Sequence, residues 1–251
     1  MKMIGIIGGS GLEDPQILQD AKEVFIETPY GKHSPIKIGR IGSVNVAILS
    51  RHGYFHEYSP SSVPYKANIH ALFKLGCNAI IATSACGSLK EEIVPGTLSL
   101  PDQFIDMTTR REQSFTEHGK VIHESMAEPF DKEIRRILEK TCKKLGFEYS
   151  SETTIITIEG CRFSTKAESN LFRVWGGDLI NMTTVPEVCL AKEMHVPYQV
   201  INLVTDYDCW RKGTEPVTFE QILKIMKSNA EKVKKVLIES LPELSKKFGN
   251  Y

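Results

Sequence analysis

Two carboxylates stand one residue apart at the end of an apolar run. The run begins near Tyr198 and ends in Asp206-Tyr-Asp208. Side chains two residues apart on an extended strand share a face, so we expect Asp206 and Asp208 to project into the same space. Because neighbouring like charges disfavour each other's ionisation, one carboxyl should keep its proton near neutral pH. Such a couple can donate one proton and accept another, although solvated turn residues would give the same pattern.

A second pair of residues suits an oxyanion. Arg51 and His52 follow the apolar segment 44–49 and precede Gly53. A guanidinium and an imidazole at the end of a strand offer several N–H donors to one anion. The alternative interpretation is a surface Arg beside a turn His.

Turns rich in small and hydroxyl-bearing residues follow other apolar segments. They are Gly8-Gly-Ser10-Gly11 and Thr83-Ser84-Ala85-Cys-Gly-Ser88, and Thr183 stands just before a predicted helix. Small residues let backbone N–H groups approach an anion, and a helix N-terminus favours negative charge. We therefore expect a phosphate-sized anion here. A nicotinamide cofactor is not expected, because Asp14 stands where G-x-G-x-x-G requires its third glycine.

These residues require a parallel arrangement of strands to bring them together. Apolar or β-branched segments predict strands at 3–7, 36–41, 44–49, 77–84, 98–101, 153–158, 179–183 and 198–205. Helical periodicity with start signals follows Pro64, Asp131, Thr165, Thr184 and Phe219. Open α/β sheets bind ligands beyond the carboxyl ends of their strands, where the turns above lie. The sequence predicts an α/β fold with one domain over residues 1–251.

Composition excludes several classes of partner. Lys+Arg and Asp+Glu each number 31, so no net charge directs the chain to nucleic acid or an anionic membrane. No apolar run approaches the roughly 20 residues of a membrane span, and glycines interrupt the first strand too early for a signal peptide. We expect a cytoplasmic protein. The 6 cysteines lack the spacing of a zinc site and are expected to be mostly buried thiols, with a disulfide left open for a hyperthermophilic source.

Six motifs together resemble one family. They are Gly8-Gly-Ser-Gly11, Arg51-His52, Thr83-Ser-Ala-Cys-Gly-Ser88, Glu159-Gly-Cys-Arg-Phe-Ser164, Asn181-Met-Thr183 and Thr205-Asp-Tyr-Asp208. In this order, over about residues 3–240, they resemble the trimeric purine nucleoside phosphorylases, and most closely the branch that acts on 5′-methylthioadenosine. The resemblance implies a single α/β domain with a mixed central β-sheet flanked by helices. It also implies a homotrimer or a dimer of trimers.

The reaction that the resemblance implies is phosphorolysis, in which inorganic phosphate attacks the anomeric carbon of a nucleoside. Phosphate is then a co-substrate, no cofactor or metal is required, and the partners are the small-molecule nucleoside and phosphate. By the same resemblance, the phosphate is held by Ser10, Arg51, His52, Ser84, the main-chain N–H of Ala85, and Thr183. Met182 is expected against the ribose, and Phe163 and Ser164 line the base pocket.

The acid couple should select the base. A carboxyl at Asp206 that donates to N7 and one at Asp208 that accepts from a 6-amino group favour adenine. Asn typically stands at the N7 position in members that act on 6-oxopurines. His123 of a neighbouring subunit, with Phe219 and Ile222, should form the 5′ pocket. Cys161 replaces a common Pro, and the chain ends at Tyr251 without the extension of some members, so adenosine could also be accepted.

Other functions stay open at this point. The nearest are a broader purine nucleoside phosphorylase and a methylthioinosine phosphorylase. A nucleoside-binding module without turnover is disfavoured by the intact Arg51, His52 and Asp206. A metal hydrolase using Asp206 and Asp208 is disfavoured because no His-rich motif accompanies the two carboxylates.

Overall fold

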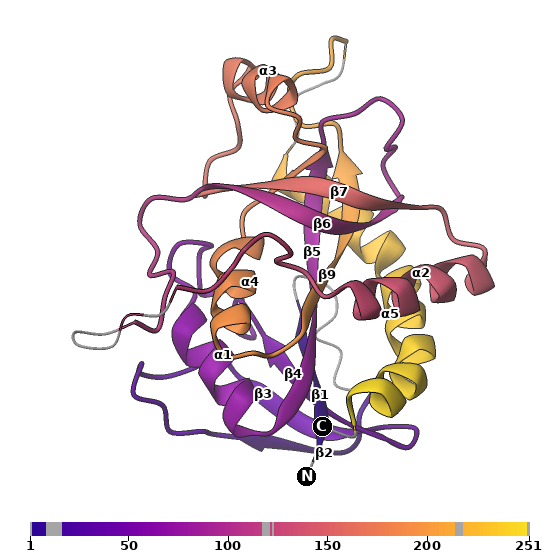
Figure 1. The fold of residues 1–251 in the computed structure, drawn as a ribbon. Coiled ribbons are helices and arrows are strands. Elements are labelled where there is room, and N and C mark those ends of the chain that lie inside the picture. The colour runs from indigo at the N-terminus through magenta and orange to yellow at the C-terminus, as the bar shows by residue number, and fades with distance from the viewer. Residues whose placement is uncertain (1, 9–16, 117–120, 122, 214–217, 250–251) are drawn as a thin grey trace.

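The computed structural model describes residues 2–8, 17–116, 121, 123–213 and 218–249 (Figure 1). The strands are β1 (Met3–Gly8), β2 (Gln19–Val24), β3 (Ile36–Ile41), β4 (Val44–Ser50), β5 (Cys77–Ser88), β6 (Leu98–Met107), β7 (Tyr149–Ile158), β8 (Leu179–Asn181) and β9 (Tyr198–Asp206). The helices are α1 (Tyr65–Lys74), α2 (Lys132–Leu145), α3 (Lys166–Val174), α4 (Thr184–Glu193) and α5 (Phe219–Phe248).

All of these strands belong to one mixed sheet. Its order is β2-β3-β4-β1-β5-β8-β7-β6-β9, and β5 also pairs with β9, so the last five strands close into a ring. β1 runs parallel to β4 and β5, and β9 runs parallel to β5, which places the carboxyl ends of these four strands at one edge. The predicted α/β class is confirmed.

Helices cover the sheet on two sides. Figure 1 shows α1 and α4 on one side of the central strands, and α2 and α5 on the other. Leu72 of α1 and Val188 of α4 belong to one apolar core, whereas Leu138 of α2 and Leu237 of α5 belong to a second. Burying one such side chain contributes about 1.5–3 kcal/mol, so these two layers hold the strand ends in place.

The predicted helix boundaries are confirmed where their signals were strongest. Asp131 Oδ1 accepts from the N–H groups of Glu133 and Ile134 at 2.9 and 2.8 Å, and so caps α2. Gly146 ends α2 in the left-handed region, with φ 68°. Thr165 and Glu168 form the expected capping box of α3.

Two strands differ from the prediction. β2 was not predicted, because most of its residues are exposed and show no apolar alternation. β6 continues to Met107, beyond the expected end at Pro101, and pairs in parallel with β7 over most of that length.

The cysteines and helices can be described briefly. The 6 cysteines are all free thiols, and Cys77, Cys86, Cys142 and Cys189 are buried, as expected. Among the described residues, none of the helices combines the length and apolar character needed to cross a bilayer.

Candidate active site

Arg51 lies in the interior at the end of β4. Its side chain is 1% exposed, and its Nε and Nη2 donate to the two carboxylate oxygens of Glu187. Nη1 donates to the carbonyl of Thr83 at 2.8 Å. These three hydrogen bonds use three of the five guanidinium N–H groups, which leaves two for an anion. The backbone is also fixed, because Ser34 Oγ donates to the Arg51 carbonyl at 3.0 Å.

Glu187 was read only as part of a helix start, and its role as the partner of Arg51 was missed. It lies on α4, is 1% exposed, and also accepts from the Tyr198 hydroxyl at 2.9 Å. Burial alone would lower the pKa of Arg51, but the Glu187 carboxylate raises it above its ordinary value. The guanidinium is therefore fixed in charge and orientation, and sequence offered no signal for a pair separated by 136 residues.

His52 is held as a neutral acceptor. Its Nδ1 lies 2.8 Å from the carbonyl of Tyr58, and because a carbonyl only accepts, Nδ1 must carry the hydrogen. In the neutral ring, Nε2 is then an acceptor. Burial, followed by the positive charge of Arg51, lowers the pKa of His52 to about 4. His52 would therefore accept a hydrogen bond from a protonated phosphate oxygen.

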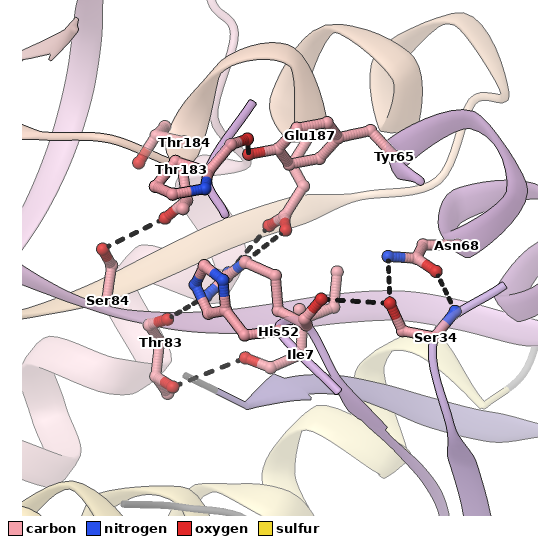
Figure 2. Close-up of polar contacts among 12 residues, drawn as sticks. Ile7, Ser34, His52, Tyr65, Asn68, Thr83, Ser84, Thr183, Thr184 and Glu187 are labelled. Carbon is pink, nitrogen blue, oxygen red and sulfur yellow. Dashed lines mark hydrogen bonds and ion pairs between the residues drawn. The ribbon is translucent and has the colours of Figure 1, made fainter. Parts of the chain in front are cut away.

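Hydroxyl groups gather between β5 and the start of α4. Ser84 Oγ lies 3.3 Å from Thr183 Oγ1 (Figure 2). Asn181 Nδ2 donates to Ser84 Oγ at 3.2 Å and to Thr184 Oγ1 at 2.7 Å, so one amide orients the group. Thr183 is the N-cap residue of α4, yet its side chain makes no capping hydrogen bond. This arrangement suits an anion near the helix N-terminus.

The two predicted acids lie together, but not for the expected reason. β9 ends at Asp206, and Asp208 has φ 52°, so no extended strand continues through both residues. A tight turn joins them instead, in which the Asp208 N–H donates to Asp206 Oδ1 at 2.7 Å. A Cβ on Gly87 would lie 3.0 Å from Asp206 Oδ1 and 3.3 Å from Asp208 Cβ. Glycine on the neighbouring strand therefore leaves room for both acids.

Both acids have raised pKa values. Burial is the largest cause for Asp206, ahead of the charge of Asp208, and it acts against a hydrogen bond from Thr205 Oγ1 at 2.6 Å. Burial also raises the pKa of Asp208. Asp208 Oδ2 is buried and has no hydrogen-bond partner among the described residues. An unpaired buried carboxyl oxygen is costly, which is typical of a group whose partner is a ligand.

The base-side residues surround this couple. Phe163 is 41% exposed. The Ser164 carbonyl accepts from Cys209 Sγ at 3.2 Å, and the Ser164 hydroxyl is buried without a partner among the described residues. Met182 packs against Gly160, since a Cβ there would lie 2.7 Å from its sulfur. Ala85 is partly buried beside Ser84.

Several predicted residues are not brought into this cluster. His123 is exposed. Ser10 lies outside the described residues, and so do the side chains of Phe219 and Ile222, although both positions belong to α5. Their expected roles stay predictions.

Known proteins resemble this chain along almost its whole length. S-methyl-5′-thioadenosine phosphorylase of Xenopus tropicalis is 49% identical over 249 residues, covering 96% of this chain and 89% of the relative. A methylthioadenosine phosphorylase from an antarctic soil metagenomic library has a TM-score of 0.92 and 40% identity, covering 97% of this chain and 86% of that chain. A mutant adenosine/methylthioadenosine phosphorylase of Schistosoma mansoni in complex with methylthioadenosine has a TM-score of 0.92 and 36% identity, covering 98% and 92%.

The family follows from these matches. The family model described as the phosphorylase superfamily matches residues 3–242. This match agrees with the family expected from the six motifs. The chain belongs to the phosphorylase superfamily.

Proposed function

We propose that this chain catalyses phosphorolysis of S-methyl-5′-thioadenosine. A phosphate oxygen attacks C1′ of the ribose, the bond from C1′ to N9 breaks, and its electron pair passes to the purine. The products are adenine and 5-methylthioribose 1-phosphate. The named relatives act on, or bind, this nucleoside, and they cover nearly all of the chain.

The phosphate is assigned to the cluster between β4, β5 and α4. Arg51 contributes its two remaining N–H groups, and the hydroxyls of Ser84 and Thr183 contribute donors 3.3 Å apart. The N–H of Ala85 and Ser10 complete the proposed set. Because Glu187 already neutralises Arg51, the site binds phosphate through oriented hydrogen bonds as well as net charge.

The adenine is assigned to the acid couple, and the geometry of this couple carries the proposal. Asp206, whose pKa burial raises, keeps a proton that it can donate to N7 as the base departs. Asp208 presents a buried oxygen without a partner among the described residues, which can accept from the 6-amino group. A 6-oxopurine would place an acceptor against this acceptor.

The remaining contacts complete the proposed substrate complex. Met182 lies against the ribose, and Phe163 and Ser164 line the base. We assign the 5′ tail to Phe219 and Ile222, with His123 supplied by a neighbouring subunit of a homotrimer or a dimer of trimers. The exposure of His123 is compatible with that assignment. Light scattering coupled to size exclusion tests it, because a monomer would leave His123 outside the site.

Adenine release tests the reaction. The chain is incubated with methylthioadenosine, with and without inorganic phosphate, and adenine is quantified by chromatography. Release that requires phosphate supports the proposal, whereas release without phosphate indicates a hydrolase. Adenosine and inosine measured in parallel reveal how far the 5′ group and the base are selected, since one relative is named for adenosine as well.

A further inference from the structure

Arg111 is a buried cation outside the residues assigned above. Its side chain is 1% exposed, although it belongs to the stretch 108–119 that sequence predicted to be irregular. Nη1 donates to the carbonyls of Met182 and Val185, each at 2.7 Å. Nη2 donates to the Glu159 carbonyl at 2.7 Å, and Nε donates to Glu159 Oε1 at 3.2 Å. One side chain therefore joins the ribose and phosphate turn to the start of the base-side turn.

The contacted carbonyls flank a break at the start of α4. Val185 has φ −100° and ψ 130°, so it is extended rather than helical, as expected for a residue before proline. Buried carbonyls beside such a break need donors. Arg111 provides them on both sides of Thr183 and Thr184.

The contact at Met182 also sets the direction of the next N–H. In a trans peptide, the C=O and the following N–H point in opposite directions. Because the Met182 carbonyl points toward Arg111, the Thr183 N–H points away from it. The Thr183 hydroxyl, 3.3 Å from Ser84, belongs to the same residue, so its position depends on this contact.

Glu159 balances the charge of Arg111 and fixes the loop that carries it. Its Oε2 accepts from the N–H groups of Thr109 and Arg110 at 2.7 and 3.0 Å, and its Oε1 accepts from Ser61. Although burial acts to raise it, hydrogen bonds from Ser61, Thr109, Arg110 and Arg111 lower the pKa of Glu159 to about 2. The carboxylate is thus charged throughout the useful pH range, and Arg111 is held in place.

We infer that Arg111, held by Glu159, is a positioning residue for phosphate and nucleoside binding, because it aligns the Met182–Val185 turn with the Glu159–Gly160 turn. This inference rests on the proposed function. Arg111 itself touches neither the acid couple nor any assigned phosphate ligand in the hydrogen bonds given above. Its loss should therefore weaken substrate binding before it alters proton transfer.

The test is Arg111→Lys, which keeps the charge but cannot bridge four acceptors. The KM for phosphate should rise about tenfold or more, equivalent to ~1.4 kcal/mol, while the pH dependence of kcat stays that of the unaltered chain. The matched control is Arg135→Met on α2, which removes another partly buried Arg that pairs with Glu139 and Glu152. Its two KM values should stay within about twofold of the unaltered chain.

The results separate this inference from the proposed function. If the unaltered chain releases no adenine, the function fails, but crystal structures of both variants still test whether Thr183 moves away from Ser84. If Arg111→Lys does not fold, Glu159→Gln removes only the charge that holds Arg111, and it should raise the KM for phosphate about threefold or more. Kinetics equal to Arg135→Met, with residues 182–185 unmoved, would overturn the positioning role.

Discussion

Replacement of Glu187 by Gln tests the buried ion pair that orients Arg51. Both side chains are 1% exposed, and no other carboxylate among the described residues bonds to this guanidinium. Gln keeps one oxygen acceptor for Arg51 but removes the negative charge. Arg51 cannot lose its proton at any useful pH, so the variant must contain an unbalanced buried cation.

The expected cost follows from this burial. Breaking a buried pair by removing one partner costs about 3–5 kcal/mol, and the retained acceptor places Glu187→Gln near the lower figure. For a chain of this size, ~1 kcal/mol shifts Tm by about 2–4 °C, so Tm should fall by about 6–12 °C. The matched control is Glu243→Gln, whose partner Lys140 is 69% exposed. That exposed pair should contribute less than ~1 kcal/mol.

Differential scanning calorimetry with and without phosphate provides the assay. A bound phosphate would supply the missing negative charge beside Arg51, so the anion should raise the Tm of Glu187→Gln more than that of the unaltered chain. Equal Tm values for Glu187→Gln and Glu243→Gln would refute the importance of the pair. Equal phosphate shifts in Glu187→Gln and the unaltered chain would refute the placement of phosphate next to Arg51.

Two further perturbations probe the site. Because burial raises the pKa of Asp206, its proton is lost only as pH rises through that raised value, so kcat/KM should fall on the alkaline side; a flat alkaline limb would exclude the donor role. His52, with a pKa of about 4, should show no ring titration by NMR above about pH 5, whereas a midpoint near its ordinary value would contradict the acceptor assignment. Gly87→Ala should lower kcat/KM about tenfold, because its Cβ would lie 3.0 Å from Asp206 Oδ1; unchanged kinetics would mean that this space is unimportant.

Sequence located the chemistry at strand ends because local patterns suffice there. The apolar run of β9 ends at Asp206, and that of β4 ends just before Arg51. The capping residues Asp131 and Thr165 likewise act within three residues of themselves. Such features depend on neighbours in the chain, so periodicity and start signals predict them.

Features that depend on distant partners could not be predicted in this way. Glu187 lies 136 residues from Arg51, and Met182 lies 71 residues from Arg111, so neither contact leaves a local pattern. The left-handed turn at Asp208 also escaped, because two acids around one residue suit a strand equally well. The pairing of β5 with β9, which closes the ring, joins segments whose apolar runs look alike.

The most direct test of the account compares two nucleosides that differ only at the purine edge. kcat/KM is measured for methylthioadenosine and for its 6-oxo analogue with the same methylthioribose, using the unaltered chain and Asp206→Asn. The unaltered chain should prefer the 6-amino substrate by about a thousandfold or more, and Asp206→Asn should reduce this preference mainly by losing activity on it. Comparable kcat/KM values for the two nucleosides with the unaltered chain would contradict the assignment of adenine to Asp206 and Asp208.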